Sequence, residues 1–311
     1  MTSIKTIFYQ HSSIFYWLHK CLFVIKSTYK EYFNSKFIVS LIPLENDFIF
    51  PKWGITTSIL MDNFITYEYD TIIPSDLTSK TIIMLGRAND KYKRFDLGIQ
   101  SMEYIIKEIP EAKMMIISSL DKTQFLHNLL YNIGLERKVY LVGFSLNPEI
   151  YFKNSSLNIF PTLTEAFPMA LCEVKIYGIP TILLGLDYVS VSKLGTIIIY
   201  DEMPESIAKE SLKIMKNKKY RKKMGRIAKL SMKKYNNILL SQKWIKLVLS
   251  TYNGEVFYRT LQNSDVKISN ETAWKILNNQ AKLIKKRKPI YLNTFLEDLL
   301  NFSYLMNFNK K

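Results

Sequence analysis

The segment from residue 81 to residue 200 alternates short apolar runs with longer stretches of helical periodicity. Apolar residues between 99 and 109 recur along one helical face, and this pattern stops before Pro110. Strands that alternate with helices indicate parallel βαβ units, so we expect an α/β fold with a doubly wound Rossmann-type sheet. The runs predicted to be buried strands are 81–85, 113–118, 138–142, 157–160, 181–184 and 196–200.

The patterns on either side of this segment are less complete. The first eighty residues hold strand candidates at 4–9 and 37–42, with helices expected at 14–33 and at 45–54. These amount to about two βα units, too few for a whole Rossmann sheet. Residues 204–250 predict two or three helices, and the last fifty residues show mixed helical patterning without a motif.

We therefore expect four parts in the chain. They are a partial N-terminal Rossmann-like domain at 1–75, a complete Rossmann-like domain at 76–203, C-terminal helices at 204–260 and a helical extension of unknown role at 261–311.

The composition narrows the class of protein. Hydrophobic residues make up 48% of the 311 residues, enough for a sizeable core. No apolar run approaches the roughly 20 residues of a membrane-spanning helix, and no signal peptide is visible. The two cysteines and three histidines match no metal-binding spacing, so we expect a cytoplasmic protein without a metal site.

The net charge of +16 is concentrated near the C-terminal end. Between Ser211 and Gly254 there are thirteen lysines or arginines and no acidic residue. Such a run is typical of a solvated helical face, and it also suits an anionic membrane surface. Nucleic acid is a weaker candidate and is not expected as a partner, because no nucleic-acid-binding motif accompanies the charge.

One stretch, PTLTEAFPMALCEVKIYGIP at 161–180, places two carboxylates around the start of a predicted helix. Glu165 lies on the loop before Pro168, and Glu173 lies about two helical turns later. Free N–H groups at a helix start, such as those of Phe167 and Met169, suit a diphosphate. Glu165 suits the hydroxyl groups of a sugar beyond the phosphates, and Glu173 suits those of a ribose.

A second cluster follows the predicted strand at 81–85. Arg87 offers a planar fork for phosphate oxygens, and Lys91, Lys93 and Arg94 add positive charge. In open parallel sheets, ligands bind at the carboxyl ends of strands. Each pattern is common by chance, but both together in one βαβ domain predict binding of a nucleotide-diphosphate sugar.

These motifs resemble those of the donor-binding domain of GT4-type retaining glycosyltransferases, which have the GT-B fold. The stretch GRANDKYKRFDLGI resembles the family's Gly-Arg…Lys-Gly segment, which implies that Arg87 and Lys93 contact the donor diphosphate. Lys91 is the alternative to Lys93, because Arg94 replaces the usual glycine. The stretch EAFPMALCE matches the Glu-x7-Glu motif, which implies that Glu165 binds the donor sugar as a catalytic candidate.

The same resemblance implies further roles. Glu173 would bind the ribose, and VYLVGF makes Gly143 and Phe144 candidates on the base side. FYQHSS resembles a first-domain strand and loop where the family often carries a histidine near the donor sugar, so His11 is a second catalytic candidate; an ordinary surface-loop histidine is the alternative. The resemblance implies no metal or other cofactor, with the nucleotide sugar as co-substrate.

The function expected from this resemblance is hexosyl transfer, with retention of configuration, to a glycan, a lipid-linked acceptor or a surface polysaccharide. The family uses two Rossmann domains, and here the first one looks incomplete. The resemblance implies that 1–75 is the partial acceptor-side domain and that 76–203 is the domain that binds the nucleotide-sugar donor. A truncated, non-catalytic nucleotide-sugar-binding module, or a subunit whose partner supplies the missing domain, is therefore the alternative. Peripheral contact with an anionic membrane remains open as well.

Overall fold

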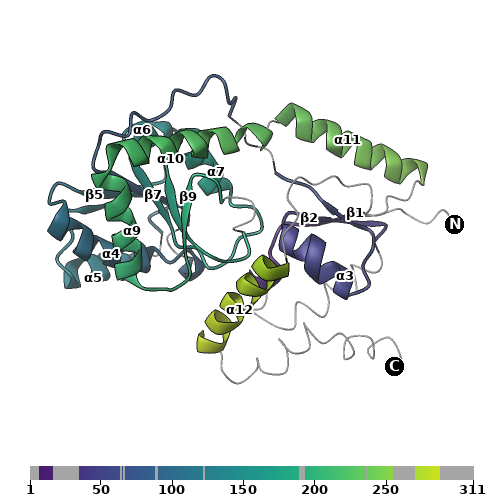
Figure 1. The fold of residues 1–311 in the computed structure, drawn as a ribbon, viewed down its shortest axis with the longest axis horizontal. Coiled ribbons are helices and arrows are strands. Elements are labelled where there is room, and N and C mark those ends of the chain that lie inside the picture. Colours follow the sequence, from purple (N-terminus) through teal and green to yellow (C-terminus); the bar gives the residue numbers. More distant parts are fainter. Residues whose placement is uncertain are drawn as a thin grey trace.

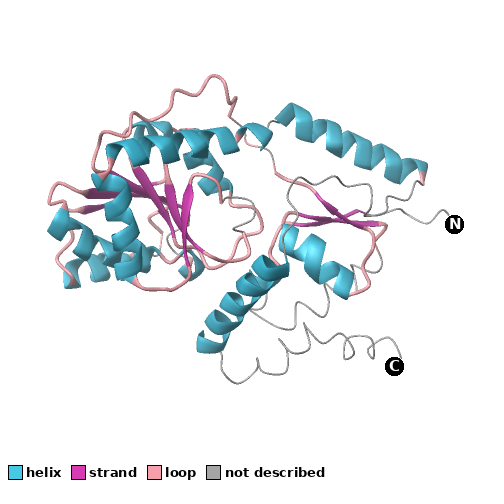
Figure 2. Ribbon diagram, in the orientation of Figure 1, coloured by secondary structure: helices cyan, strands magenta, loops and turns pink. Residues whose placement is uncertain are grey.

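The computed structural model contains two parallel sheets flanked by helices (Figures 1 and 2). The α/β class expected from the sequence is confirmed. The residues that the structure describes are 7–16, 35–63, 65, 67–87, 90–121, 123–188, 193–235, 237–254 and 270–287.

The larger sheet has six strands in the order β6-β5-β4-β7-β8-β9, and every neighbouring pair is parallel. Each of the six apolar runs expected to form a strand does so. The strands are β4 (Thr81–Leu85), β5 (Lys113–Ile117), β6 (Val139–Gly143), β7 (Leu157–Phe160), β8 (Thr181–Leu184) and β9 (Thr196–Ile199).

The strand order reverses between β4 and β7, which are neighbours although 71 residues of chain separate Leu85 from Leu157. Such a reversal leaves a crevice at the carboxyl ends of the two strands, where ligands bind in open α/β sheets. The two sequence motifs follow β4 and β7, so the topology brings them to the same crevice.

Helices cover the larger sheet. Gly98 lets one of them, α4 (Phe95–Glu108), pack closely, since an added Cβ there would lie 2.4 Å from the sulfur of Met84. The other helices of this part are α5 (Gln124–Asn132), α6 (Glu149–Lys153), α7 (Met169–Ile176), α9 (Pro204–Lys216) and α10 (Lys218–Ser231).

The smaller sheet has three parallel strands in the order β1-β2-β3. They are β1 (Ile7–Gln10), β2 (Phe37–Ser40) and β3 (Ser58–Leu60), of which the last was not expected from the sequence. The short helix expected at 45–54 is formed by η1 (Glu45–Ile49) and α3 (Phe50–Lys52) and ends at Gly54, whose φ is 71°. Of the helix expected at 14–33, residues 14–16 are helical and the rest lies outside the described residues.

Two helices late in the chain return to the smaller sheet. After η3 (Lys233–Tyr235), α11 (Asn237–Asn253) lies beside β1 and β2 in Figure 1, and its Leu247 packs with Phe37 and Val39. The helix α12 (Asn270–Arg287) lies between the two sheets in the same view. A single hydrophobic cluster joins Ile276 of α12 to residues around the smaller sheet and to residues around the larger sheet, which are the two parts of the molecule.

The basic run lies mainly on α9, α10 and the turn that follows. One member differs from the rest: Arg221 is buried, and its guanidinium donates to the backbone oxygens of Leu77, Ile214 and Met215. Arg221 therefore stabilises the fold and is not part of the charged surface. No helix among the described residues is both long and apolar enough to span a membrane.

Candidate functional site

The loop after β4 turns back over the end of its own strand. Gly86 has a φ of 154°, and an added Cβ there would touch the stem of Lys93 at 3.7 Å. Asp90 accepts a hydrogen bond from the N–H of Tyr92 at 3.1 Å and so caps the short turn η2 (Lys91–Lys93). The carboxylate of Asp90 also pairs with the exposed guanidinium of Arg87 at 3.3 Å.

Lys93 is the basic residue of this loop that reaches the β7 side. Its Nζ donates a hydrogen bond to Oε1 of Glu165, and the two side chains are only 14% and 17% exposed. Burial raises the pKa of Glu165, and the nearby ammonium of Lys93 opposes that shift. Lys91 is exposed instead, with its Nζ 5.6 Å from the centre of the Tyr92 ring.

Arg94 adopts a left-handed conformation with a φ of 52°, a region that a glycine enters without strain. Its side chain is held by Asp96 and by Glu202, which follows β9. These ion pairs engage the guanidinium of Arg94 with carboxylates other than Glu165.

The loop after β7 is mostly buried. Phe167 is 6% exposed and packs edge-to-face against Tyr235, with ring centres 5.2 Å apart. Pro168 caps α7, and Gly178 beyond its end has a φ of 72°. The N–H of Met169 donates to the carbonyl of Phe167 at 2.9 Å, so this group, expected to face a diphosphate, is already engaged.

Glu173 lies on α7, two turns beyond Glu165, and burial raises its pKa. Its charge acts on Tyr67, which lies in the linker between β3 and β4. The pKa of the Tyr67 phenol is raised mainly by burial and, to a smaller extent, by the negative charge of Glu173. Tyr67 also meets Tyr177 edge-to-face at 6.1 Å. Sequence reasoning missed Tyr67, because nothing in the local pattern of the linker marks it.

His11 follows β1 and is exposed, with its ring 3.9 Å from that of Tyr9. Its loop approaches the larger sheet, since Tyr16 meets Tyr92 edge-to-face at 5.7 Å. Gly143 ends β6 with a φ of 87°, and Phe144 after it is 76% exposed. Gly143 and Phe144 lie at the carboxyl end of β6, which is two strands away from β4, the strand that precedes Lys93.

Sequence reasoning also missed two buried carboxylates near this crevice, Glu45 and Asp187. Burial raises the pKa of Glu45 to about 8 and that of Asp187 to about 7. In the sequence, each looks like an ordinary loop or helix acid. Across the part of the chain that the structure describes, no group of three or more His, Cys, Asp or Glu side chains is arranged to hold a metal ion.

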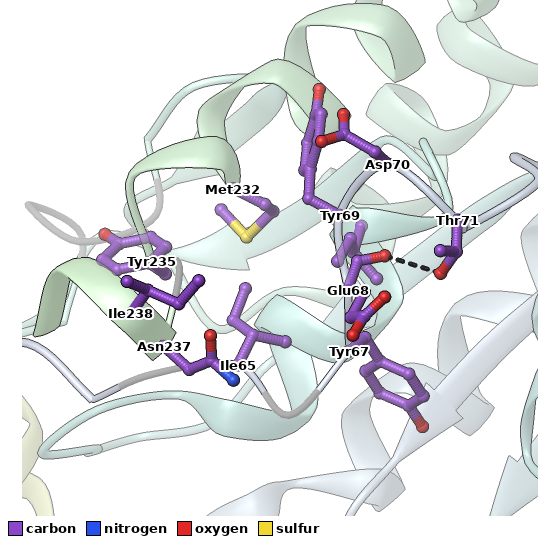
Figure 3. Close-up of a pocket in the computed structure, with 11 residues that line it drawn as sticks. Ile65, Tyr67, Glu68, Tyr69, Asp70, Thr71, Met232, Tyr235, Asn237 and Ile238 are labelled. Atoms are coloured by element: carbon purple, nitrogen blue, oxygen red, sulfur yellow. Dashed lines mark hydrogen bonds between the residues drawn. The ribbon is translucent and has the colours of Figure 1, made fainter. Parts of the chain in front are cut away.

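A pocket of about 180 Å³ lies beside the linker and borders α7 at Ile176. Ile65 and linker residues 67–71 form one wall, and Met232, Tyr235 and Ile238 form another (Figure 3). The rings of Tyr67 and Tyr69 point in opposite directions in this view. The pocket therefore borders the α7 helix without containing the Lys93–Glu165 pair.

A family model described as "Glycosyl transferases group 1" matches residues 68–231, which is more than half of the chain. The chain belongs to this family. The matched region of this group 1 glycosyl transferase includes both motifs and begins one residue after Tyr67.

Known relatives and solved structures agree. An uncharacterized glycosyltransferase of Haemophilus influenzae is 26% identical over 117 residues, covering 36% of this chain and 33% of its own. The poly(glycerol-phosphate) alpha-glucosyltransferase of Bacillus subtilis is 22% identical over 274 residues, covering 80% of this chain and 39% of the relative. The crystal structure of S. aureus TarM, in complex with Fondaparinux, alpha-GlcNAc-glycerol and UDP, has a TM-score of 0.68 at 17% identity, covering 79% of this chain and 51% of TarM.

The structural likeness shows a shared fold and confirms the GT-B-like architecture expected from the sequence. This group 1 glycosyl transferase spans between 25% and 40% of the length of four curated relatives that it matches.

Proposed function

We propose that the protein transfers a hexose from a nucleotide-diphosphate sugar to a glycan, lipid-linked or surface-polysaccharide acceptor, with retention of configuration. The observation that carries the proposal is the contact between Lys93 and Glu165 at the ends of β4 and β7. This contact supports the proposal because it brings together a cation suited to the donor diphosphate and a carboxylate suited to the sugar that the diphosphate carries.

The donor diphosphate would lie against Arg87 and Lys93. Both are cations, and they would stabilise the negative charge that develops on the leaving diphosphate, so the reaction would need no metal. The N–H of Phe167 would add a neutral donor. Glu165 would then hold the sugar hydroxyls, Glu173 the ribose, and Gly143 with Phe144 the base.

In the proposed step, the bond between the anomeric carbon and the phosphate oxygen breaks, and its electron pair leaves with the diphosphate. An acceptor oxygen bonds to the anomeric carbon on the same face, and its proton passes to the leaving phosphate oxygen. His11 would contact the donor sugar from the other side of the crevice. The name of the Bacillus relative supports retention, because an alpha product from an alpha-linked donor keeps its configuration.

The names of two similar proteins suggest which acceptors to test first. The Bacillus relative is named for poly(glycerol-phosphate), and the TarM structure contains alpha-GlcNAc-glycerol and UDP. We therefore propose UDP-sugars as the first donors and glycerol-phosphate polymers as the first surface-polysaccharide acceptors.

A second candidate function is nucleotide-sugar binding without turnover, either alone or as a subunit whose partner supplies more of the first domain. Among the described residues, the first sheet has three strands and the second has six, and this difference supports the second candidate. In that case the donor would bind as proposed, but no product would form unless the partner were added.

We also propose that the protein is cytoplasmic and makes a peripheral contact with an anionic membrane. Lysines of α10 are exposed (Lys218, Lys219, Lys222 and Lys223). The next helix, α11, exposes Leu239, Ile245, Val248 and Leu249 alongside its lysines. Exposed lysines next to an exposed apolar helix suit a lipid surface that carries negative charge.

One experiment tests the main proposal. UDP-, GDP- and ADP-sugars are titrated into the full chain by calorimetry, and any donor that binds is then incubated with acceptors while products are sought by mass spectrometry. Binding and transfer support the glycosyltransferase, and binding without transfer supports the binding module. If no nucleotide sugar binds, both proposals are wrong.

A further inference from the structure

Three segments from distant parts of the chain converge on the carboxylate of Asp187, which follows β8 and is fully buried. Its Oδ2 accepts hydrogen bonds from Oγ of Ser13 at 2.5 Å and from Oγ1 of Thr164 at 2.8 Å. Its Oδ1 accepts a hydrogen bond from Nε2 of Gln280 at 3.1 Å. Asp187 therefore connects the loop after β1, the loop after β7 and the helix α12.

Two of these donors are neighbours of proposed catalytic residues. Thr164 immediately precedes Glu165, and Ser13 lies two residues after His11. The amide of Gln280 holds the Glu165 loop a second time, because it also donates to the carbonyl of Leu163 at 2.9 Å.

A second buried carboxylate fixes the other side of the His11 loop. Glu45 accepts a hydrogen bond from the N–H of Ile14 at 2.7 Å and from Nε2 of Gln10 at 2.6 Å. Glu45 thus holds Gln10 and Ile14 at the two ends of this segment, and Asp187 after β8 holds Ser13 between them.

Burying a carboxylate between two parts of a protein costs desolvation free energy, and apolar packing of similar volume is often as stabilising. Hydrogen bonds to a carboxylate are directional, however, and a fully satisfied buried network fixes one arrangement of its members. The hydrophobic cluster that contains Ile276, Phe167 and Ile38 already joins the two parts, so the Asp187 cluster adds direction to an existing contact.

We infer that Asp187 is a positioning residue that fixes the loop of Glu165 relative to the loop of His11, and thereby aligns the two sides of the crevice for transfer. This inference rests on the proposed function, because it assigns the alignment to the donor sugar held between these loops. Asp187 acts on the two loops through the hydrogen bonds that it accepts from Ser13 and Thr164.

The test uses three substitutions of nearly unchanged shape in the full chain: Ser13→Ala, Thr164→Val and Asp187→Asn. Each variant is assayed for turnover of the donor that the parent uses and for binding of UDP. Misalignment of reacting groups lowers kcat by about 10- to 100-fold, whereas UDP lacks the sugar and should bind within about twofold of the parent. Because Ser13 acts through Asp187, the Ser13→Ala/Asp187→Asn double variant should be no slower than Asp187→Asn alone.

Arg221→Met is the matched control for buried charge. Arg221 is also buried and also binds three groups, but these are backbone carbonyls within the larger part. We expect this control to lower the melting temperature and leave kcat unchanged below it. If Asp187→Asn behaves in the same way, with a lower melting temperature and an unchanged kcat, its role is structural and the inference is overturned.

Hydrogen exchange on the unliganded protein separates this inference from the proposed function. If Asp187 joins the two loops, Asp187→Asn should speed exchange in residues 10–16 and 161–167 together, and Arg221→Met should do neither. Faster exchange in only one loop, or in neither, overturns the inference whatever the protein catalyses. A parent that binds and transfers no nucleotide sugar overturns the proposed function, while coupled exchange would still support the link through Asp187.

Discussion

Nζ of Lys93 donates a hydrogen bond to the carboxylate of Glu165, although 72 positions separate the two residues in the sequence. The contact exists because β4 and β7 are parallel neighbours, so the loops that follow them begin at the same end of the sheet. A diphosphate bound there would compete with Glu165 for the ammonium of Lys93.

We predict that Lys93→Met weakens binding of the preferred nucleoside diphosphate by about 1.5 to 3 kcal/mol, since it removes a charge-assisted hydrogen bond. Binding of the free nucleoside should change little, because Lys93 would contact phosphate. Calorimetry with UDP and uridine measures both. Lys91→Met, an exposed lysine of the same loop, is the control; if it lost affinity and Lys93→Met did not, the phosphate contact would belong to Lys91.

Glu173→Gln should weaken binding of UDP and of uridine alike, because the proposed partner is the ribose, which both contain. The expected loss is about 1.5 to 3 kcal/mol for a hydrogen bond to a charged group. The partly buried site should accept the amide without unfolding, which circular dichroism checks. Equal affinities of parent and variant for uridine would remove Glu173 from the ribose site.

The raised pKa of Glu45, about 8, predicts a pH-dependent stability. Between the usual carboxyl pKa and that value, folded Glu45 keeps a proton that the unfolded chain has lost. The free energy of unfolding therefore falls as the pH rises through this window, and it levels off above it. Asp187, which faces Glu45 and has its pKa raised to about 7, adds to the same trend.

Melting temperatures measured from pH 5 to pH 9 check this expectation. Glu45→Gln should reduce the slope, leaving the share that belongs to Asp187. Glu108→Gln is the control, because Glu108 is exposed and paired with Lys216 at 2.6 Å, which lowers its pKa. An unchanged slope in Glu45→Gln would show that Glu45 is ionised in the folded protein.

Exposed lysines of α10 should drive association with anionic vesicles. We expect co-sedimentation with phosphatidylserine vesicles to fall with salt and to drop when Lys218, Lys219, Lys222 and Lys223 become glutamine, since each basic residue near the surface contributes about 1 kcal/mol. Arg221 is left intact because it is buried. Equal partitioning onto neutral and anionic vesicles would exclude an electrostatic membrane contact.

The sequence predicted the larger sheet well because its central strands β4, β7 and β8 are buried and read as continuous apolar runs. The strand β3 was missed because Ser58–Leu60 is short and follows threonines. Lys93 and Glu165 were proposed from their positions after two predicted strands and then from the motif resemblance, whereas their contact depends on strand order. The role of Asp187 could not be predicted from the sequence, since its partners Ser13 and Gln280 come from opposite ends of the chain.

A chain leaves the ribosome from its N-terminus, and domains generally fold as units during synthesis. The strands that surround Asp187 are complete by Ile199, but Gln280 is made some eighty residues later. The nascent protein therefore holds a finished sheet beside an unfinished crevice, and we expect the final alignment of its loops to wait until α12 has emerged and docked.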